Sequence, residues 1–595
     1  MTTPIKLIQL AFNGGTEIDV TDADIVVLVG PNNSGKSRTL QEISMILSEQ
    51  RGMAFLASQL FALSSVTFDR LMDLPEFKDW LTEHRRRFFP PNNPQEHFKT
   101  VGSGELPMTS VDHWWETPDH LGPLTPQLVR LFPPGETRNI VSATGRIEFS
   151  AVPDHPIQAL LRNQTMMDEF ESAFTTAFHL NPIPDGWGQN NRIRVSRDEK
   201  QNDFATTSSN GYPGDVLAAR LEKLPFIENQ SDGVRAYAGM LLALLAADYP
   251  ILLLDEPETF LHPPQARLIG EHLGVLRREG QLVIATHSLD VLLGLLKNSD
   301  TRVMVVRLTR NGDASEARTI PPERVRSISS DALLRFSNVL DGLFHEGVVI
   351  CEGDTDSLFY SAVAQHLAET EYGLSTSRSG SGLKFTANSF DTMFTHAGGK
   401  HRIAKACTAL VEVGVPVRVI ADFDVLDDRR TVEQIVKSLG AEYTDEIENL
   451  RSVVDKNIRG GERKPTFESA KRLIDPLLAR DDNVELDKST TQKVVKAVKL
   501  VGGWADVKKL GKSAVPHGET TVKLEALLEQ LATIGLFVVP VGEVESWVPG
   551  VASSSSVWIA DVIQNNSVQM AIEAGKFVHD VLGSLFANSN HSSVS

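Results

Sequence analysis

The sequence predicts an α/β protein with two successive domains, each built around a buried parallel sheet. The first observation is that residues 25–29 and 251–254 form short, uninterrupted apolar runs, which is typical of buried strands. The second is a glycine-rich turn directly after the first run. The third is that acidic residues follow two later apolar runs, 348–351 and 417–421, and the carboxyl ends of parallel strands meet at one edge of a sheet.

Length and composition limit the class of protein. A chain of 595 residues favours several hydrophobic cores, and 41% hydrophobic with 23% charged residues is ordinary for a globular protein. No apolar run is long enough to predict a membrane span, and the first residues lack an apolar signal core, so we expect a cytoplasmic protein with no membrane partner. Two cysteines, Cys351 and Cys407, argue against a disulfide framework or a cysteine zinc site.

The net charge of −19 argues against a uniformly basic nucleic-acid binder, but the charge is uneven. Between Arg451 and Lys512 there are 15 Lys plus Arg against 9 Asp plus Glu. In this basic island Lys493, Lys496 and Lys499 recur every three residues, so they would share one helical face. Two interpretations stay open: a surface that binds DNA phosphates, or a solvated helix face.

The first apolar run leads into the motif Gly-x-x-x-x-Gly-Lys-Ser, which predicts a phosphate-binding loop between a strand and a helix beginning near Lys36. Glycines let backbone N–H groups surround phosphates, Lys36 would reach the β- and γ-phosphates, and Ser37 would hold Mg²⁺. A chance glycine turn is the alternative. The expected nucleotide-binding residues of this loop are Gly30, Asn32, Asn33, Ser34, Gly35, Lys36 and Ser37.

The second half of the nucleotide site follows the run 251–254. Asp255 would meet the metal, and Glu256 stands where a base could polarise the attacking water. Ser231 and Gly233, in Ser-Asp-Gly-Val-Arg, open a predicted helix just before this strand. His287 follows the strand 282–285 in Thr-His-Ser, about 30 residues after Asp255. Alone it would be read as a structural histidine, but this arrangement resembles that of ABC-type ATPases, in which a histidine at this place senses the γ-phosphate.

Long stretches separate these motifs. We expect a first domain over 1–340 with a large insertion at about 51–225, outside the catalytic core and a candidate for dimerisation. A hairpin is predicted over 303–320, with Asn311-Gly312 at its turn. A second domain over 341–588 would hold a basic helical insertion at about 427–533, and 589–595 is a polar tail expected to be disordered.

The second domain has acidic residues after three apolar runs. Glu352 and Asp356 follow the first run, Asp422 and Asp424 the second, and Glu543 and Glu545 the third. Converging carboxylates need cations to offset their repulsion, and two Mg²⁺ ions can activate water in phosphodiester cleavage. Taken singly, each piece has a plainer interpretation, as a capped helix start or a solvated loop. The ordered set predicts a metal centre.

The first half of the chain resembles ABC-type ATPases. Ser231-Asp-Gly-Val-Arg resembles their signature, although it departs from the common Leu-Ser-Gly-Gly-Gln, and no Q-loop glutamine is placed. The second half resembles a Toprim domain, a Rossmann-like parallel sheet, with Gly-Gly-Lys400 between the first Glu and Asp-x-Asp. Nearly the whole chain is similar to the OLD (overcoming lysogenisation defect) family, which includes Gabija-type and retron-associated defence nucleases.

This resemblance implies the cofactors ATP and Mg²⁺, with Mn²⁺ an alternative at the nuclease site. It carries metal binding onto Glu352, Asp356, Asp422, Asp424 and Glu545, the last matching better than Glu543. It also implies a lysine near the scissile phosphate, for which Lys576 is the candidate; the alternative is a solvated helical lysine. The implied partners are DNA, a second copy in a dimer or tetramer through the ATPase domains, and a helicase or a retron reverse transcriptase with its RNA.

The function expected is an ATP-binding and ATP-hydrolysing, metal-dependent DNA endonuclease or nickase that acts in defence against phage. One alternative is a nucleotide-switched DNA-binding scaffold with a weak nuclease. The other is a topoisomerase- or primase-like Toprim enzyme. The six tyrosines lie in no recognisable nucleophile domain, and two cysteines cannot build the zinc ribbon usual in a primase.

Overall fold

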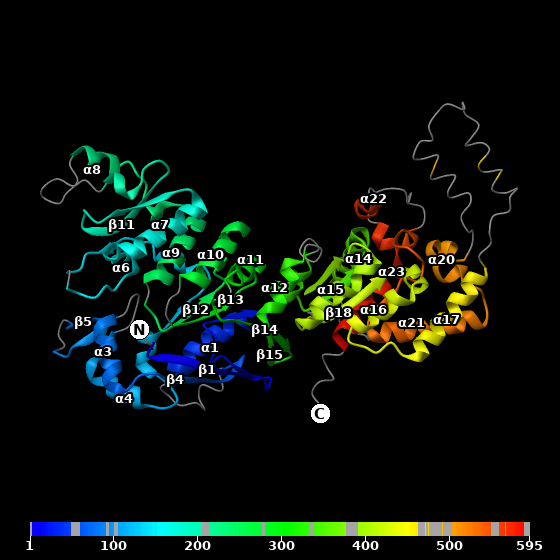
Figure 1. The fold of residues 1–595 in the computed structure, drawn as a ribbon, viewed down its shortest axis with the longest axis horizontal. Coiled ribbons are helices and arrows are strands. Elements are labelled where there is room, and N and C mark those ends of the chain that lie inside the picture. The colour runs from blue at the N-terminus through cyan, green and yellow to red at the C-terminus, as the bar shows by residue number, and fades with distance from the viewer. Residues whose placement is uncertain are drawn as a thin grey trace. The chain divides into compact units, whose positions relative to one another are not determined.

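The computed structural model describes most of the chain as two compact units, Met1–Ser329 and Ser330–Ser595 (Figure 1). Residues 330–340, assigned to the first domain from sequence, group with the second unit. The basic residues Lys493, Lys496 and Lys499 and the tail 589–595 lie outside the described residues. The described residues are 3–48, 60–90, 94–99, 105–148, 150–204, 215–246, 248–276, 280–298, 300–331, 338–375, 391–461, 471, 474, 491, 503–548, 558–565 and 567–587.

The first unit is organised around a six-stranded sheet in the order β15-β14-β3-β13-β12-β8. All neighbouring strands are parallel except the β14–β15 hairpin, which confirms the hairpin predicted at Asn311-Gly312. Strand β13, which precedes Thr286 and His287, lies between β3, which leads into the phosphate loop, and β12, which ends at Asp255. The strands are β3 (Ile25–Val29), β8 (Val129–Phe132), β12 (Ile251–Asp255), β13 (Gln281–Ala285), β14 (Val303–Asn311) and β15 (Ala314–Ile320).

Helices pack on this sheet because their apolar positions recur on one face. Leu40, Ile43 and Leu47 of the helix after the phosphate loop are fully buried in the main core. Helices α10 and α11 pack closely on each other. The helices of the unit that adjoin the motifs are α1 (Lys36–Ser48), α9 (Asp232–Ala246), α10 (Pro263–Val275), α11 (Leu289–Leu295) and α12 (Pro322–Ser330).

The region 51–225 is not a single insertion outside the core. Its strand β4 (Leu63–Arg70) pairs with β1 (Ile5–Phe12), and β8 completes the edge of the main sheet. The sequence signal was weak because β8 is a four-residue edge strand containing Arg130, without a continuous apolar run. Within the described part of the chain, the segments between these strands form separate small sheets, ordered β5-β6-β7 and β10-β11-β9.

The remaining elements of the first unit lie around these sheets. The strands are β2 (Glu17–Asp19), β5 (Arg86–Phe88), β6 (His97–Lys99), β7 (Glu105–Pro107), β9 (Thr144–Gly145), β10 (Asn181–Asp185) and β11 (Asn190–Ser196). The helices are α3 (Leu74–His84), α4 (Val111–Glu116), α5 (Thr125–Leu128), α6 (Pro156–Arg162), α7 (Gln164–Phe178) and α8 (Asp215–Leu221).

Two buried polar side chains join the small N-terminal sheet to the main core. The Gln281 amide accepts a hydrogen bond from Leu7 N–H at 2.8 Å and donates to Val20 O at 3.1 Å. The carboxylate of Glu42, fully buried in α1, accepts from the N–H groups of Ala62 and Leu63 at the start of β4. Because a buried charge without such donors is costly, these bonds fix β4 against the phosphate-loop helix.

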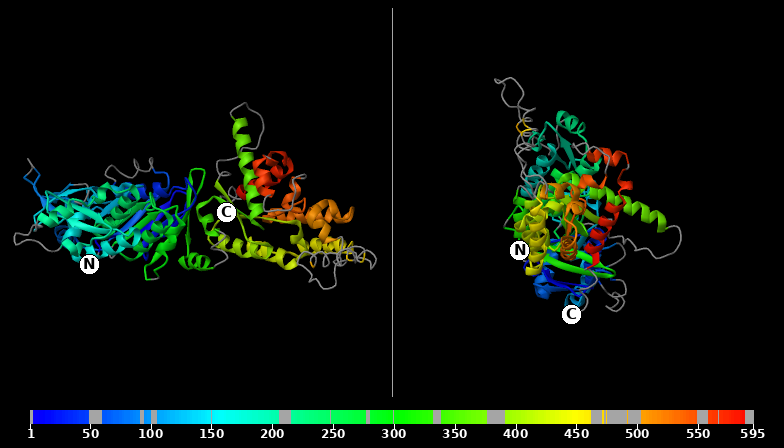
Figure 2. Two further views of the ribbon diagram at one scale, coloured as in Figure 1. Left: turned by 90° about the horizontal axis from the view of Figure 1, so that it is seen from above. Right: turned by 90° about the vertical axis from the view of Figure 1, so that its right-hand side faces the viewer.

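The second unit has a four-stranded parallel sheet in the order β17-β16-β18-β19. The central strands β16 and β18 are buried throughout, as expected for a sheet with both faces covered. In Figure 2 (left) the long helix α14 extends beyond the sheet from which it starts. The strands are β16 (Gly347–Cys351), β17 (Thr392–His396), β18 (Val417–Ala421) and β19 (Leu536–Val538).

The helices of the second unit are α14 (Asp354–Ser375), α15 (Lys400–Glu412), α16 (Arg429–Ser438), α17 (Asp445–Gly460), α20 (Trp504–Leu510), α21 (Glu519–Ile534), α22 (Trp558–Gln564) and α23 (Ile572–Ala587). Its core is aromatic, with Phe359, Tyr360 and Trp558 fully buried. Among the described helices of the whole chain, none combines the length and apolarity that crossing a membrane requires.

Candidate nucleotide site and metal centre

The phosphate loop is built by backbone that only certain residues adopt. Gly30 and Gly35 have φ of 139° and 97°, and Asn33 has φ of 62°. A Cβ on Gly30 would lie 2.2 Å from the carbonyl oxygen of Leu308 on β14, so a larger residue would displace the loop. Asn32 and Asn33 are exposed at the tip, and Ser34 is buried.

Lys36 is held inside this loop. Its ammonium donates to the carbonyl oxygens of Gly30 and Pro31, both at 2.7 Å, and lies 3.4 Å from Ser34 Oγ. The side chain is almost fully buried, so the loop keeps a desolvated positive charge at its centre. A phosphate bound here would exchange neutral carbonyl partners for an anionic one, which strengthens each hydrogen bond.

Ser37 and Asp255 meet although 218 positions separate them in the chain. Ser37 Oγ donates to Asp255 Oδ1 at 2.9 Å, which joins the start of α1 to the end of β12. Burial raises the pKa of Asp255 to about 6; Glu256 adds to the rise and the Ser37 hydroxyl opposes it. A divalent cation between this hydroxyl and carboxylate would favour the charged carboxylate, so the pair fits the Mg²⁺ of a bound nucleotide.

Glu256 and His287 face each other beside this pair. Their side chains lie 3.8 Å apart, Oε1 to Nε2, and each is about one-third exposed, at 36% and 32%. Glu256 has the left-handed φ of 47°, and its N–H donates to Ala285 O at 2.8 Å. A non-glycine residue in this conformation is strained, and the bond to β13 holds it so that the carboxylate stays at the open end of the sheet.

Glu258 is a residue that the sequence analysis did not single out. Its Oε1 accepts hydrogen bonds from Thr286 Oγ1 at 2.9 Å and from His287 N–H at 2.8 Å. Burial raises its pKa above the ordinary value for Glu. The available signal was a third acidic residue in Asp-Glu-Pro-Glu, but nothing local indicated that it would reach the neighbouring strand.

The structure places Ser231 and Gly233 at the first turn of α9. Ser231 is exposed, and a Cβ on Gly233 would lie 2.7 Å from the carbonyl oxygen of Phe260, in the loop after Glu258. Asp232 between them pairs with Arg138 at 3.4 Å. The predicted nucleotide contact of Ser231 and Gly233 through a second copy stays a prediction.

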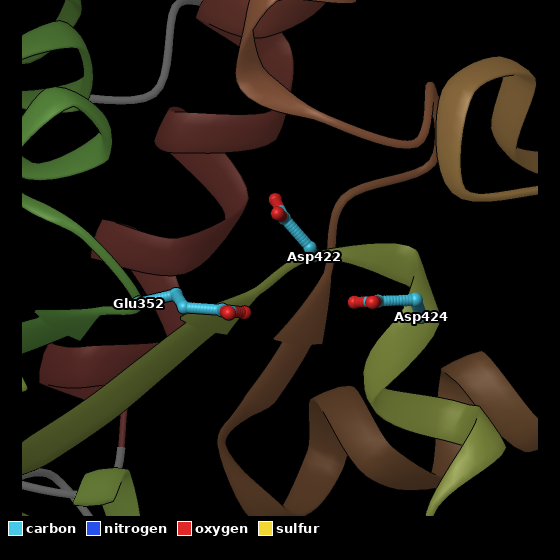
Figure 3. A group of neighbouring side chains, drawn as sticks. All are labelled: Glu352, Asp422 and Asp424. Atoms are coloured by element: carbon cyan, nitrogen blue, oxygen red, sulfur yellow. The ribbon is translucent and has the colours of Figure 1, made fainter. Parts of the chain in front are cut away.

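In the second unit, three carboxylates come together at the carboxyl ends of adjacent strands. Glu352 follows β16, and Asp422 and Asp424 follow β18; one oxygen of each lies within 4.8 Å of the others. Figure 3 shows Glu352 and Asp424 pointing toward one another, with Asp422 beside the gap between them. Parallel pairing of β16 with β18 therefore brings residues 70 positions apart to one point.

The electrostatics of this cluster fit a divalent cation. Glu352 Oε2 and Asp424 Oδ1 are buried and have no hydrogen-bond partner in the described structure. Burial and the neighbouring carboxylates Asp356, Glu352 and Asp424 raise the pKa of Asp422 to about 8. Burial, and the Asp424 charge after it, likewise raise the pKa of Glu352. Unpartnered buried oxygens and mutual repulsion are both relieved by a bound cation with oxygen ligands.

Asp356 and the two late glutamates border the cluster on different sides. Asp356 Oδ2 accepts from Gly353 N–H at 2.7 Å, and burial raises its pKa to about 6, with Glu352 and Glu545 adding to the rise. Burial raises the pKa of Glu543 above its ordinary value, although the charge of Lys508 opposes the rise. The charge of Glu545 thus raises the pKa of Asp356, whereas Glu543 interacts with Lys508. Metal binding by Asp356 and Glu545 stays a prediction.

Two lysines reach the carboxylates, and only one was noted from the sequence. Lys400 Nζ lies 3.2 Å from Asp424 Oδ2, and Lys508 Nζ lies 3.3 Å from the same oxygen. Lys576 is on an exposed face of α23, where its ammonium pairs with Glu573 at 2.8 Å. Lys508 was hidden among the many lysines of the basic island, and the contact of Lys576 with a phosphate stays a prediction.

Comparisons with known proteins agree with this arrangement. The family model of an AAA domain (AAA_21) matches residues 180–294, and the model described as overcoming lysogenization defect protein-like, TOPRIM domain, matches residues 343–424. The Old nuclease of Escherichia phage P2 is 25% identical over 235 residues, covering 38% of this chain. The match spans 36%, about a third, of that relative's length.

Fold and site together define a P-loop ATPase domain followed by a Toprim domain. The two family models and the phage relative show that these two domains are similar to those of OLD-type ATPase–Toprim proteins. Among solved structures, the SMC head domain from Thermotoga maritima is 13% identical, with a TM-score of 0.28 over 53% of this chain and 99% of that one. An SmcHead bound to the C-winged helix domain of ScpA is 11% identical, with a TM-score of 0.33 over 53% of this chain and 99% of that one.

Proposed function

We propose that the chain is an ATP-binding and ATP-hydrolysing, divalent-metal-dependent DNA endonuclease or nickase that acts in defence against phage. The observation that carries the nuclease is the convergence of Glu352, Asp422 and Asp424 on a point that buried, unpartnered oxygens surround. Like charges in a poorly solvated site repel one another, and a divalent cation would relieve that repulsion. The defence role and the DNA substrate are supported by the similarity to OLD-type proteins.

The chemistry follows from the two sites. A divalent cation bound by Glu352, Asp422 and Asp424, Mg²⁺ or Mn²⁺, would polarise the scissile phosphate and lower the pKa of a bound water. Asp356 and Glu545 complete the acidic side, and Lys400 keeps positive charge beside Asp424. In the first unit Lys36 and Ser37 would bind the phosphates and Mg²⁺ of ATP, and Glu256, with His287 3.8 Å away, would orient the attacking water.

Self-association belongs to the same proposal. Ser231 and Gly233 would complete the nucleotide site of a second copy, so that ATP joins two ATPase units in a dimer, or in a tetramer of two such pairs. ATP would in this way set the geometry of the nuclease units. A helicase or a reverse transcriptase–RNA complex is the kind of partner that the family resemblance suggests.

The experiment is cleavage of a supercoiled plasmid by the purified protein. We expect nicked or linear product with Mg²⁺ or Mn²⁺ and none with EDTA. Asp422→Ala and Glu352→Ala should each abolish cleavage and leave ATP hydrolysis intact, because the ATP site has its own metal ligands, Ser37 and Asp255. Lys437→Met, which removes an exposed surface lysine paired with Glu433, is the matched control for purification and folding.

Two results would contradict the proposal. Equal cleavage by wild type and both carboxylate variants would assign the activity to a contaminant. DNA binding without metal-dependent cleavage by the wild type would favour the nucleotide-switched scaffold.

A further inference from the structure

Asp424 has two ammonium groups on one oxygen. Lys400 Nζ and Lys508 Nζ lie 3.2 and 3.3 Å from Asp424 Oδ2, and Lys400 also donates to the Asp424 carbonyl oxygen at 3.2 Å. Lys400 is the first residue of α15, which packs next to the sheet. Lys508 comes from α20, 84 positions beyond Asp424, in the helical region that interrupts the Toprim sheet between β18 and β19.

The backbone that carries Lys508 is fixed to the loop after β19. A Cβ on Gly542 would lie 2.4 Å from Lys508 O, so only glycine lets the two segments approach this closely. Ser546 Oγ donates to Lys509 O at 3.0 Å, and Lys512 N–H donates to Pro540 O at 2.9 Å. The opposite end of α20 is held by Trp504, whose Nε1–H donates to Asp455 Oδ1 at 2.8 Å.

This packing gives Lys508 a defined place. Its side chain is 43% exposed and that of Asp424 is 16% exposed, so the lysine joins a mostly buried carboxylate to the solvent-accessible surface. Burial lowers the pKa of Lys508, but Asp424, Asp422 and Glu543 more than offset this and raise it. The lysine therefore stays charged.

Charge at the centre is unevenly compensated. Asp424 and Glu352 repel each other, and both act on Asp422. Asp424 is the member of the described cluster that forms ion pairs with lysines, Lys400 and Lys508, and both pairs are at Oδ2. A divalent cation that approaches Asp424 through Oδ2 therefore meets two ammonium groups, whereas Oδ1 is buried and has no hydrogen-bond partner in the described structure.

We infer that Lys508 is a resident counter-cation of the nuclease centre, which competes with a divalent cation for Asp424 Oδ2. This deepens the proposed function and rests on it. Because Lys508 comes from the helical region and its side chain is partly open to solvent, a nucleic-acid phosphate that draws it away from Asp424 would free Oδ2 for a second cation. The centre is thereby coupled to substrate binding.

The test is Mn²⁺ binding to the full-length protein without nucleotide or DNA, by titration calorimetry, with Asp422→Ala as the background for other sites. Lys508→Met and Lys508→Gln should bind Mn²⁺ about tenfold more tightly than wild type, or bind a further equivalent, because a competing charge is removed from Asp424. Lys508→Arg keeps the charge and should bind as wild type does. Lys437→Met, an exposed lysine of the same unit, is the matched control.

The outcomes separate this inference from the proposed function. Mn²⁺ binding that is unchanged in both Lys508→Met and Lys508→Gln would overturn the role of Lys508 and leave the metal-dependent nuclease standing. Wild-type protein that binds no Mn²⁺ above the Asp422→Ala background would overturn the proposed function itself. Two neutral variants are used so that a folding defect in one does not remove the test. The Mn²⁺ titration is then repeated with a non-cleavable oligonucleotide bound. The difference in Mn²⁺ affinity between wild type and Lys508→Gln should become smaller, because the oligonucleotide phosphate draws Lys508 away from Asp424 in the wild type.

Discussion

Glu258 and His287 are joined by a hydrogen bond of 2.8 Å from the His287 N–H to Glu258 Oε1. The same oxygen accepts from Thr286 Oγ1, so one carboxylate holds both residues at the end of β13. Glu258 lies two residues after Glu256, on the loop that leaves β12. The bond therefore fixes the separation between Glu256 and His287, the two side chains on either side of the expected water position.

We predict that Glu258→Ala slows ATP hydrolysis by about tenfold or more with little change in KM, since losing a buried acceptor costs about 1–3 kcal/mol and releases His287 from its place. Glu258→Gln keeps an oxygen for both donors and should restore most of the rate. Steady-state hydrolysis with purified protein gives kcat and KM separately. A wild-type kcat in the alanine variant would show that the bond does not position the site.

We predict that Lys36→Ala weakens ATP binding roughly ten- to hundredfold, because a charge-assisted hydrogen bond to phosphate contributes about 1.5–3 kcal/mol. The loop carbonyls of Gly30 and Pro31 also lose their donor, so the loop itself should loosen. Binding of a fluorescent ATP analogue measures the effect. The Toprim unit should be unaffected, with Mn²⁺ binding of the variant as the control, and unchanged nucleotide affinity would contradict the assignment of the loop.

We predict that Mn²⁺ affinity at the nuclease centre rises as pH increases from about 6 to about 8.5. The pKa values of Asp356 and Asp422 are raised to about 6 and about 8, so below these values the carboxyls hold protons that the metal must displace. Affinity should change by up to about tenfold per pH unit below the higher pKa. Titrations in buffers of different ionisation enthalpy count the released protons.

Asp422→Asn is the variant that separates this effect from a general influence of pH on the protein. It should bind Mn²⁺ more weakly throughout and lose the upper part of the pH dependence, because no proton titrates at that position. A slope equal to that of wild type would assign the proton to another group. An affinity that falls as pH rises would contradict the sign of the shift at Asp422.

Much of the site could be predicted because its parts are continuous in sequence. Gly30 to Ser37 forms a loop whose backbone requirements are local, and the strands before Asp255 and Glu352 are uninterrupted apolar runs, which is typical of buried strands. The order of these runs also predicted two parallel sheets, which the structure shows. Each of these conclusions needed information from no more than about ten neighbouring residues.

Other features were decided by contacts between distant segments. Strand β8 was missed because a short edge strand is stabilised by pairing with β12 and has no strong pattern of its own. Glu258 looks like any loop carboxylate until β12 and β13 pair. Likewise, the family resemblance pointed to Lys576, while the packing of α20 on the loop at Gly542 placed Lys508 beside Asp424.

By itself the sequence determined which residues are candidates for binding phosphate and metal, because that chemistry depends on side chains at fixed local spacing. The tertiary structure decided which charges face one another, because Coulomb energy depends on distances of a few ångströms that chain position does not specify. Asp424 illustrates the difference. Its place after a buried strand predicts an acidic residue of the centre, and only the folded chain brings Lys400 and Lys508 to the same oxygen of Asp424.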